Sequence, residues 1–425
     1  MIEKLTLQNG VRILYEQAPS VRSCSLGLWV ESGSRHEPAQ LNGISHFIEH
    51  MLFKGTESRT AAQLAESFDA IGGQVNAFTT KENTCFYART LDTHLQEAAD
   101  LLCDMYFHSR FGQQETDLER GVILEEIGMY EDTPDDLVVE RLSSAVYGGC
   151  PLGRPILGTK ETLDGIQGQT LADYVSRCYT PANTLVSVAG SFTPTDIEKI
   201  AARFEAMPAG RPPIAQPAAY KPAFTLKEKD IEQNHLCVAF PGIAAGSEDR
   251  YRMQVMSNIL GGGMSSRLFQ RVREESGLCY SIYSFSSSYL DSGYFGVYTA
   301  LGRQTEMQAL ALIRQEIARF VEQGPDQQEV ARTVEQLKSS ALMSLESMNS
   351  RMTANARSEY LYGRPLTPED IIRGYDAVTR EGVHQLARQL LDFDQISFSA
   401  VGQVSDESAY KTCLLGPHGR TAILV

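Results

Sequence analysis

The sequence predicts an α+β protein of two homologous domains, each a mostly antiparallel sheet with helices packed on one face. Strand-like runs occur in close pairs, at 74–80 with 83–91 and at 278–287 with 292–300. Runs this close pair as antiparallel strands, because a parallel pair needs a long crossover. Segments with helical periodicity separate the pairs, at 60–70, 93–107, 113–130, 305–322 and 327–347. A doubly wound parallel sheet would instead need strict alternation of strand and helix.

The two halves of the chain resemble each other, as a duplication would produce. A β-rich run that breaks at Gly190 matches a run that breaks at Gly402. Near the start of each half, the apolar run 25–30 parallels 236–240. The repeat supports two domains of the same kind.

A proline-rich stretch lies near the midpoint. Five of the 17 prolines fall between Ala206 and Pro222. Because proline fixes φ and removes a backbone donor, this stretch predicts an extended linker. We therefore expect a domain at 1–207, a linker at 208–222 and a second domain at 223–425. A chain of 425 residues is also too long for one hydrophobic core.

Composition and charge exclude several classes of protein. Hydrophobic residues make up 42% and charged residues 21%, which is ordinary for a soluble globular protein. The formal charge of −15 disfavours nucleic acid and anionic membranes as partners. The sequence shows no apolar run long enough for a membrane span and no signal peptide at its start. With eight scattered cysteines that predict reduced thiols, we expect a cytoplasmic protein.

The strongest signal for chemistry is the pattern His46-x-x-Glu49-His50. Residues four apart lie on one face of a helix, so both imidazoles can bind one metal ion. Glu49 lies at the edge of that face, where a carboxylate can take a proton from zinc-bound water. The pattern is an inverted form of His-Glu-x-x-His, a catalytic zinc motif. The competing interpretation is a pair of helix-face histidines beside a surface glutamate.

A third metal ligand is expected from another element, because a catalytic zinc usually has three protein ligands. The segment 117–130 predicts a helix with an apolar stripe formed by Val122, Ile123, Ile127 and Tyr130. Glu119 and Glu126 fall within this stripe, and a buried carboxylate needs a cation or strong donors. We expect Glu126 to bind zinc and Glu119 to orient a histidine. Alternatively, both acids pair with arginines such as Arg120 or Arg89.

Together these residues resemble the pattern of the pitrilysin/insulinase (inverzincin) zinc metallopeptidases, with Glu126 following His50 by 76 residues. The chain is most similar to the bacterial short-chain members that resemble mitochondrial processing peptidase, over nearly its whole length. Further family-like stretches lie at 43–55, 72–80, 151–158 and 179–183.

The resemblance implies a role for each residue of the motif. One zinc per chain would be bound by His46, His50 and Glu126, with Glu49 as general base and Glu119 supporting the site. In a further stretch, Asn76 and Ala77 match an edge strand that pairs with the substrate backbone in the family. Without the family, 74–80 is only one arm of a hairpin.

The second half has no metal motif, but Arg273 and Tyr280 resemble an arginine–tyrosine pair of the family. A guanidinium can hold substrate carbonyl oxygens, and a phenol can donate to a developing oxyanion. Taken alone, Arg273 fits a surface ion pair and Tyr280 the start of a strand. The glycines at 261–263 meet no phosphate-binding pattern and predict a turn before a helix.

The resemblance thus implies a zinc-dependent endopeptidase that hydrolyses peptides or unfolded segments in a closed chamber. Family chambers contain four domains and this chain supplies two, so we expect a homodimer in which Arg273 and Tyr280 act in trans. The alternatives are the catalytic subunit of a heterodimer with a related chain and a non-catalytic scaffold. The physiological substrate does not follow from the sequence.

Overall fold

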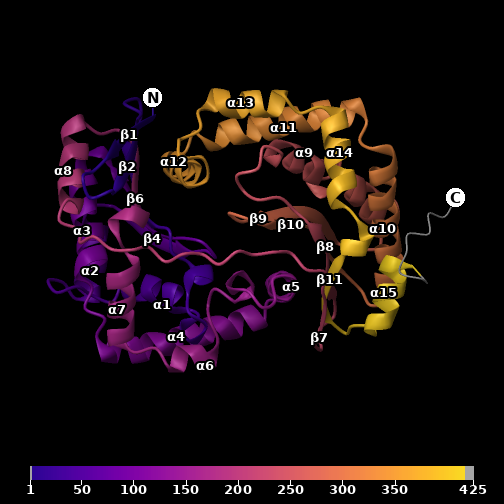
Figure 1. Ribbon diagram of the computed structural model, residues 1–425, viewed down its shortest axis with the longest axis horizontal. Coiled ribbons are helices and arrows are strands. Elements are labelled where there is room, and N and C mark those ends of the chain that lie inside the picture. Colours follow the sequence, from indigo (N-terminus) through magenta and orange to yellow (C-terminus); the bar gives the residue numbers. More distant parts are fainter. Residues whose placement is uncertain (1, 417–425) are drawn as a thin grey trace. The chain divides into compact units, whose positions relative to one another are not determined.

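The computed structural model describes residues 2–416, which form two compact units (Figure 1). The first unit runs to Gly128 and adds Arg154–Gln216 and Leu342–Thr367. The second contains Met129–Gly153, Pro217–Ala341 and the chain from Pro368 onward. Each unit has one sheet with helices packed against it, which is the predicted α+β class.

The sheet of the first unit has six strands in the order β1-β2-β6-β3-β5-β4. Strands β2 and β6 are parallel, and every other neighbouring pair is antiparallel. The strands are β1 (Ile2–Thr6), β2 (Arg12–Gln17), β3 (Ser23–Val30), β4 (Gln74–Thr79), β5 (Thr84–Leu91) and β6 (Thr184–Gly190). Strand β4 lies at one edge of this sheet.

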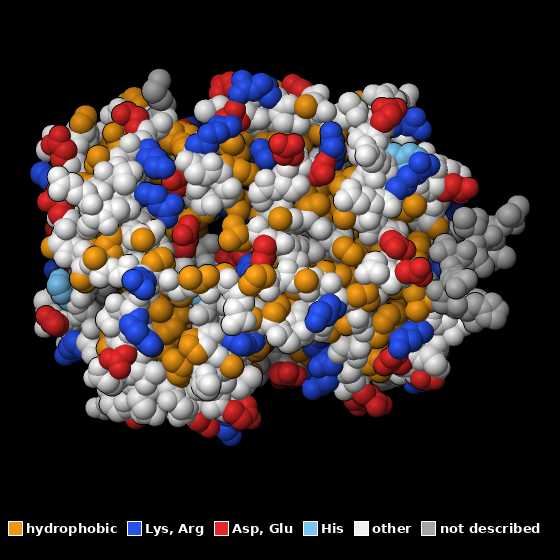
Figure 2. Space-filling model, in the orientation of Figure 1, with side chains coloured by type: hydrophobic (Ala, Val, Ile, Leu, Met, Phe, Trp, Pro, Cys, Tyr) orange, Lys and Arg blue, Asp and Glu red, His pale blue; other side chains and the backbone are white. Residues whose placement is uncertain are grey.

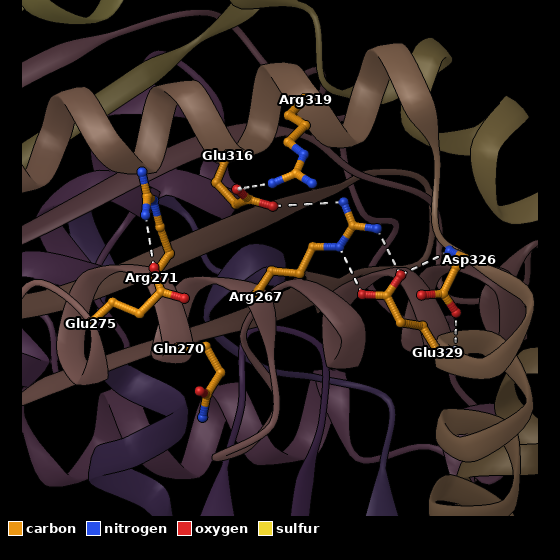
Figure 3. Close-up of a pocket in the computed structure, with 8 residues that line it drawn as sticks. All are labelled: Arg267, Gln270, Arg271, Glu275, Glu316, Arg319, Asp326 and Glu329. Carbon is orange, nitrogen blue, oxygen red and sulfur yellow. Dashed lines mark hydrogen bonds and ion pairs between the residues drawn. The ribbon is translucent and has the colours of Figure 1, made fainter.

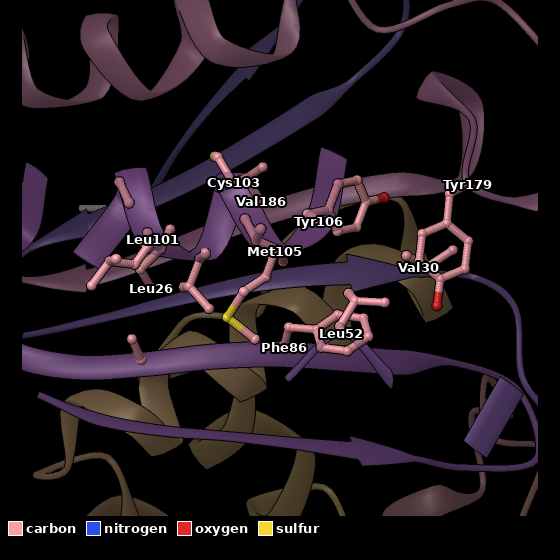
Figure 4. Close-up of a cluster of buried hydrophobic side chains, with 14 of the residues drawn as sticks. Leu26, Val30, Leu52, Phe86, Leu101, Cys103, Met105, Tyr106, Tyr179 and Val186 are labelled. Atoms are coloured by element: carbon pink, nitrogen blue, oxygen red, sulfur yellow. The ribbon is translucent and has the colours of Figure 1, made fainter. Parts of the chain in front are cut away.

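The main core of the first unit lies on one face of this sheet. Figure 4 shows Met105 and Tyr106 of helix α3 beside Leu26 and Phe86 of strands β3 and β5. Apart from α5, which is described below, the helices of the first half of the chain are α1 (Ile44–Met51), α2 (Ala61–Ala70), α3 (Leu95–His108), α4 (Gln113–Glu131), α6 (Lys160–Asp164), α7 (Gly168–Cys178) and α8 (Pro194–Phe204). Alternate strand residues face this core, as the two-residue period of a strand requires.

The opposite face of the first sheet is covered by helix α12 (Met348–Tyr362), which comes from the second half of the chain. Met352 and Ala356 of this helix pack on Trp29 and Leu185. Helices therefore cover both faces of the sheet, whereas the sequence predicted helices on one face only.

The second unit repeats the architecture, with strand order β7-β11-β8-β10-β9. Its one parallel pair, β7 with β11, corresponds to β2 with β6. The strands are β7 (Phe224–Glu228), β8 (Asn234–Pro241), β9 (Ser281–Ser288), β10 (Gly293–Leu301) and β11 (Ser397–Gly402). The helices are α9 (Arg250–Gly261), α10 (Glu306–Gln323), α11 (Gln327–Ser344), α13 (Pro368–Asp376), α14 (Arg380–Leu390) and α15 (Glu407–Leu415), with a π-helical stretch at Phe269–Glu274.

The second face of the second sheet is covered by helix α5 (Pro134–Val146), which comes from the first half of the chain. Pro134 is at its first turn and Thr133 is its N-cap residue. The Thr133 side chain makes no capping hydrogen bond, because its hydroxyl donates to the Met129 carbonyl oxygen at 2.7 Å.

The compact units therefore differ from the predicted domains at 1–207 and 223–425. Each half of the chain contributes one helix to the sheet of the other half, because both faces of each sheet are apolar and need a cover. The stretch 208–222 has no helix or strand.

The face of the molecule drawn in Figure 2 has a mixed charge pattern. Acidic and basic side chains are interspersed on the face shown in Figure 2, without one large patch of either sign. Among residues 2–416, no helix combines the length and apolar character needed to cross a membrane.

Candidate metal centre

Helix α1 carries His46, Glu49 and His50 and is fixed at its N-terminus by a buried carboxylate. Glu37 accepts hydrogen bonds from the backbone N–H groups of Gly43 and Ser45, both at 2.8 Å. Gly43 has a φ of 96°, and a Cβ there would lie 2.7 Å from the Leu157 carbonyl oxygen. Only glycine fits this approach, so the start of the helix is fixed.

The two histidines lie on the same face of α1. Their ring centroids are 4.5 Å apart. His46 is buried, and burial, together with the charge of the neighbouring His50, lowers the pKa of His46 to about 3. His46 is therefore neutral at neutral pH, which is the form that binds metal.

Helix α4 brings Glu126 to these histidines. Ile123 is fully buried in the core, and Arg120 donates to the carbonyl oxygens of Leu163 and Ile166 at 3.0 and 2.6 Å. These contacts fix the helix, and they show that Arg120 does not pair with Glu119 or Glu126 as the alternative interpretation required.

The predicted apolar stripe of α4 is only partly correct. Val122 and Tyr130 are 51% and 45% exposed, whereas Ile123 is buried and Ile127 is half-buried against the core. The stripe facing the core is therefore narrower than the sequence indicated.

The distances between the three side chains fit a tetrahedral metal ion. Oε2 of Glu126 lies 3.5 Å from Nε2 of His46 and 3.6 Å from Nε2 of His50. These separations are too long for good hydrogen bonds. They approach the edge of about 3.3–3.4 Å that bonds of about 2.0–2.1 Å give around tetrahedral zinc. Within the described part of the chain, this trio is the one group of His, Cys, Asp or Glu with ligand atoms so close together.

Glu49 lies beside this trio and is held by strand β4. The Thr79 hydroxyl donates to Oε2 of Glu49 at 2.5 Å. Burial raises the pKa of Glu49, and the Thr79 hydrogen bond and the His50 charge oppose this rise. A divalent cation at the cluster would add to that opposition, because positive charge stabilises a carboxylate.

Glu119 supports His50 from the side away from Glu126. Oε1 of Glu119 lies 2.8 Å from Nδ1 of His50, and Oε2 lies 2.7 Å from Nζ of Lys54. The contact holds His50 with Nε2 directed at Glu126. The structure thus places Glu119 where the sequence expected an orienting acid.

Strand β4 carries the two residues expected to bind substrate. Its only neighbour among the described strands is β5, so one row of its backbone groups has no strand partner. The N–H of Ala77 donates to Oδ1 of Asn76 at 2.8 Å. A free edge can accept an added strand.

Arg273 and Tyr280 lie together in the second unit. The Arg273 guanidinium carbon is 5.2 Å from the centre of the Tyr280 ring and 4.6 Å from that of Phe269. Tyr280 is 74% exposed. Arg273 lies in the π-helical stretch, a conformation often found at functional sites.

Three residues with clear contacts were not predicted from the sequence: Glu37, Lys54 and Thr79. Lys54 follows His50 by four residues, a spacing that could have indicated a shared partner. Glu37 accepts from backbone groups six and eight residues further along the chain, and Thr79 reaches Glu49 from strand β4; neither contact follows from a local sequence pattern.

A second polar hollow lies within the second unit, lined by Arg267, Gln270, Arg271, Glu275, Glu316, Arg319, Asp326 and Glu329 (Figure 3). Its charges are mutually paired. Arg267 contacts Glu329 at 2.7 Å and Glu316 at 3.6 Å, and Arg271 contacts Glu275 at 2.7 Å. This pairing differs from the metal centre, where the ligand atoms face one another without hydrogen bonds.

The site has two histidines and one carboxylate around a common point, and a second carboxylate lies beside them. Three such ligands with a neighbouring acid are typical of a zinc hydrolase. Residues 12–160 match the family described as "Insulinase (Peptidase family M16)", and residues 165–337 match the one described as "Peptidase M16 inactive domain". The chain belongs to peptidase family M16.

Known proteins similar to this chain agree with the assignment. An uncharacterized zinc protease of Bacillus subtilis, YmxG, is 47% identical and covers 93% of this chain and 97% of its own. An uncharacterized zinc protease of Streptomyces coelicolor is 38% identical, with coverage of 96% and 91%. A peptidase M16 inactive domain from Pseudomonas fluorescens shares the fold, with a TM-score of 0.88, 21% identity and coverage of 95% and 98%.

Proposed function

We propose that the protein is a zinc-dependent endopeptidase. The observation that carries the proposal is the convergence of His46, His50 and Glu126 with Glu49 at their side. The naming of its relatives as zinc proteases supports zinc as the metal. One zinc per chain would be held by these three ligands.

The residues around the trio would carry the steps of peptide hydrolysis. When bound, zinc supplies a Lewis acid that polarises the scissile carbonyl and makes water more acidic. Glu49 takes the proton from the attacking water and delivers it to the leaving amine. Thr79 holds one oxygen of Glu49, which leaves Oε1 for this transfer.

Strand β4 would hold the substrate in an extended form. Its backbone groups near Asn76 and Ala77 that have no strand partner would pair with the peptide by β-augmentation, with the Ala77 N–H exchanging the Asn76 side chain for the peptide. Only peptides or unfolded segments can present an extended backbone in this way. The preferred substrate is therefore a flexible chain.

Arg273 would hold substrate carbonyl oxygens, and Tyr280 would donate to the oxyanion. The proposed assembly is a homodimer that encloses a chamber, where each zinc site uses these two residues from its partner. The exposed Tyr280 ring, with Arg273 next to it, supports a role toward another molecule. A heterodimer with a related chain is the alternative assembly.

Metal analysis of two neighbouring glutamate variants tests the ligand assignment. Glu126→Gln should lose zinc and peptide cleavage together, because it removes one of three ligands. Glu125→Gln is the matched control, since Glu125 is exposed on the same helix and lies outside the trio. Equal zinc content in Glu126→Gln and the wild type would overturn the assignment.

A further inference from the structure

Lys54 contacts the carboxylate that holds a proposed zinc ligand. Glu119 is only 5% exposed, and its two oxygens have different partners. Oε1 contacts Nδ1 of His50 at 2.8 Å, and Oε2 contacts Nζ of Lys54 at 2.7 Å. His50 and Lys54 thus share one acid on a different helix.

The arrangement follows from the path of the chain at the end of α1. The helix ends at Met51, and the N–H of Lys54 donates to the Met51 carbonyl oxygen at 3.0 Å. This turn keeps Lys54 near His50, four residues earlier. Glu119 reaches both from α4, so one carboxylate joins the two helices that carry the metal ligands.

A buried carboxylate is costly unless a cation or several donors accompany it. When Nε2 of His50 binds a metal, Nδ1 must carry the proton and needs an acceptor. Lys54 stabilises the charged form of that acceptor. The same ammonium group, considered only as a charge, would repel a divalent cation nearby.

We propose that Lys54 is a positioning residue that strengthens zinc binding by acting through Glu119 on His50. This inference rests on the proposed function, because it takes zinc as the metal at the trio. The inference predicts the direction in which zinc affinity changes when the lysine charge is removed. Action through Glu119 predicts weaker zinc binding, whereas direct charge repulsion predicts tighter binding.

Zinc affinity of the purified full chain, measured by competition with a fluorescent chelator at one pH, provides the test. Lys54→Met should weaken zinc binding about 10- to 100-fold, the range seen when outer partners of metal ligands are lost. Lys54→Arg keeps the charge and should retain most of the affinity. Lys160→Met removes an exposed lysine of α6 and should leave the affinity unchanged.

A double-mutant cycle identifies the route of the effect. In a Glu119→Gln background, Lys54→Met should cause no further weakening. The inference is overturned if Lys54→Met binds zinc as tightly as the wild type or more tightly, or if it weakens binding equally in both backgrounds. A wild-type chain that binds no zinc would overturn the proposed function itself, which separates the two failures.

Discussion

At the scale of single residues, the Thr79 hydroxyl sets the orientation of Glu49. Oε2 of Glu49 accepts its hydrogen bond at 2.5 Å. The nearby Thr84 hydroxyl donates to the Ser32 carbonyl oxygen at 2.9 Å, so its proton is committed elsewhere. Among the described residues, Thr79 is thus the hydrogen-bond donor to the proposed base, and it lies on the same strand that would hold the substrate.

Replacement of Thr79 by valine should lower kcat while KM and zinc content change little. Valine keeps the shape and strand preference of threonine but removes the donor. The loss of one hydrogen bond to a carboxylate should reduce kcat roughly tenfold. Thr79→Ser keeps the hydroxyl and should restore most of the rate. Steady-state kinetics on a quenched peptide measure this difference. Equal kcat values for the valine and serine variants would contradict the role of Thr79.

Site residues could be predicted from the sequence where their contacts join residues that are close in sequence or lie in a clear helical pattern. His46 and His50 could be paired from sequence because four-residue spacing on a helix fixes their common face. Glu126 is 76 residues from His50, yet its position in an amphipathic helix indicated that it needed a partner. Thr79 could not be predicted, because its contact depends on how strand β4 packs beside α1.

At the scale of elements, helix α12 is fixed to the first sheet by both apolar and polar contacts. Met352 is fully buried, and its sulfur lies 3.4 Å from Nε1 of Trp29. A Cβ at Gly27 would lie only 2.5 Å from that sulfur, so the strand leaves room for the helix. Asn355 adds a hydrogen bond to buried Glu16 at 3.0 Å.

Replacement of Met352 by alanine should destabilise the first unit by about 2–5 kcal/mol, the usual cost of such a cavity. Because Trp29 is the one tryptophan of the chain, its fluorescence should report the change as a red shift. Urea unfolding followed by this signal measures both effects. Met343→Ala, at an exposed position, should change stability by less than about 0.5 kcal/mol. Equal midpoints for the two variants would contradict the packing of α12 on this sheet.

Most elements could be predicted from sequence, but the helix exchange could not. The helix predicted at 113–130 is observed at Gln113–Glu131, and the strands predicted at 74–80 and 83–91 are β4 and β5. Periodicity shows that a helix has an apolar face. It does not show which sheet that face covers, so the exchange of α5 and α12 required the structure.

At the scale of the whole molecule, the two units divide the proposed chemistry. The metal ligands lie in one unit and the arginine–tyrosine pair in the other. Five strands of the first sheet, β2-β6-β3-β5-β4, follow the same order as the five strands of the second sheet, β7-β11-β8-β10-β9. This agrees with the duplication predicted from the sequence.

Mixing two inactive variants tests action in trans. Glu49→Gln lacks the base. Arg273→Ala with Tyr280→Phe lacks both the group that would hold substrate carbonyl oxygens and the oxyanion donor, so each variant alone should be inactive. In a homodimer, equal mixing by joint refolding should restore about a quarter of wild-type activity, since half the dimers are mixed and each has one complete site.

Two results would contradict a homodimer whose sites act in trans. The first is that mixed dimers, isolated by two affinity tags, regain no activity. This would show that Arg273 and Tyr280 do not act in trans. A wild-type chain that is inactive alone and gains activity with a related chain would favour the heterodimer.

The central claim is that Glu49 activates water for peptide hydrolysis at a zinc site of this chain. Its most direct test is zinc content and cleavage of a quenched, unstructured peptide, measured together for wild type and Glu49→Gln. We predict about one zinc per chain in both proteins, with cleavage reduced about 10²- to 10⁴-fold in the variant. Wild-type protein without zinc, or equal cleavage by both proteins, would contradict the account.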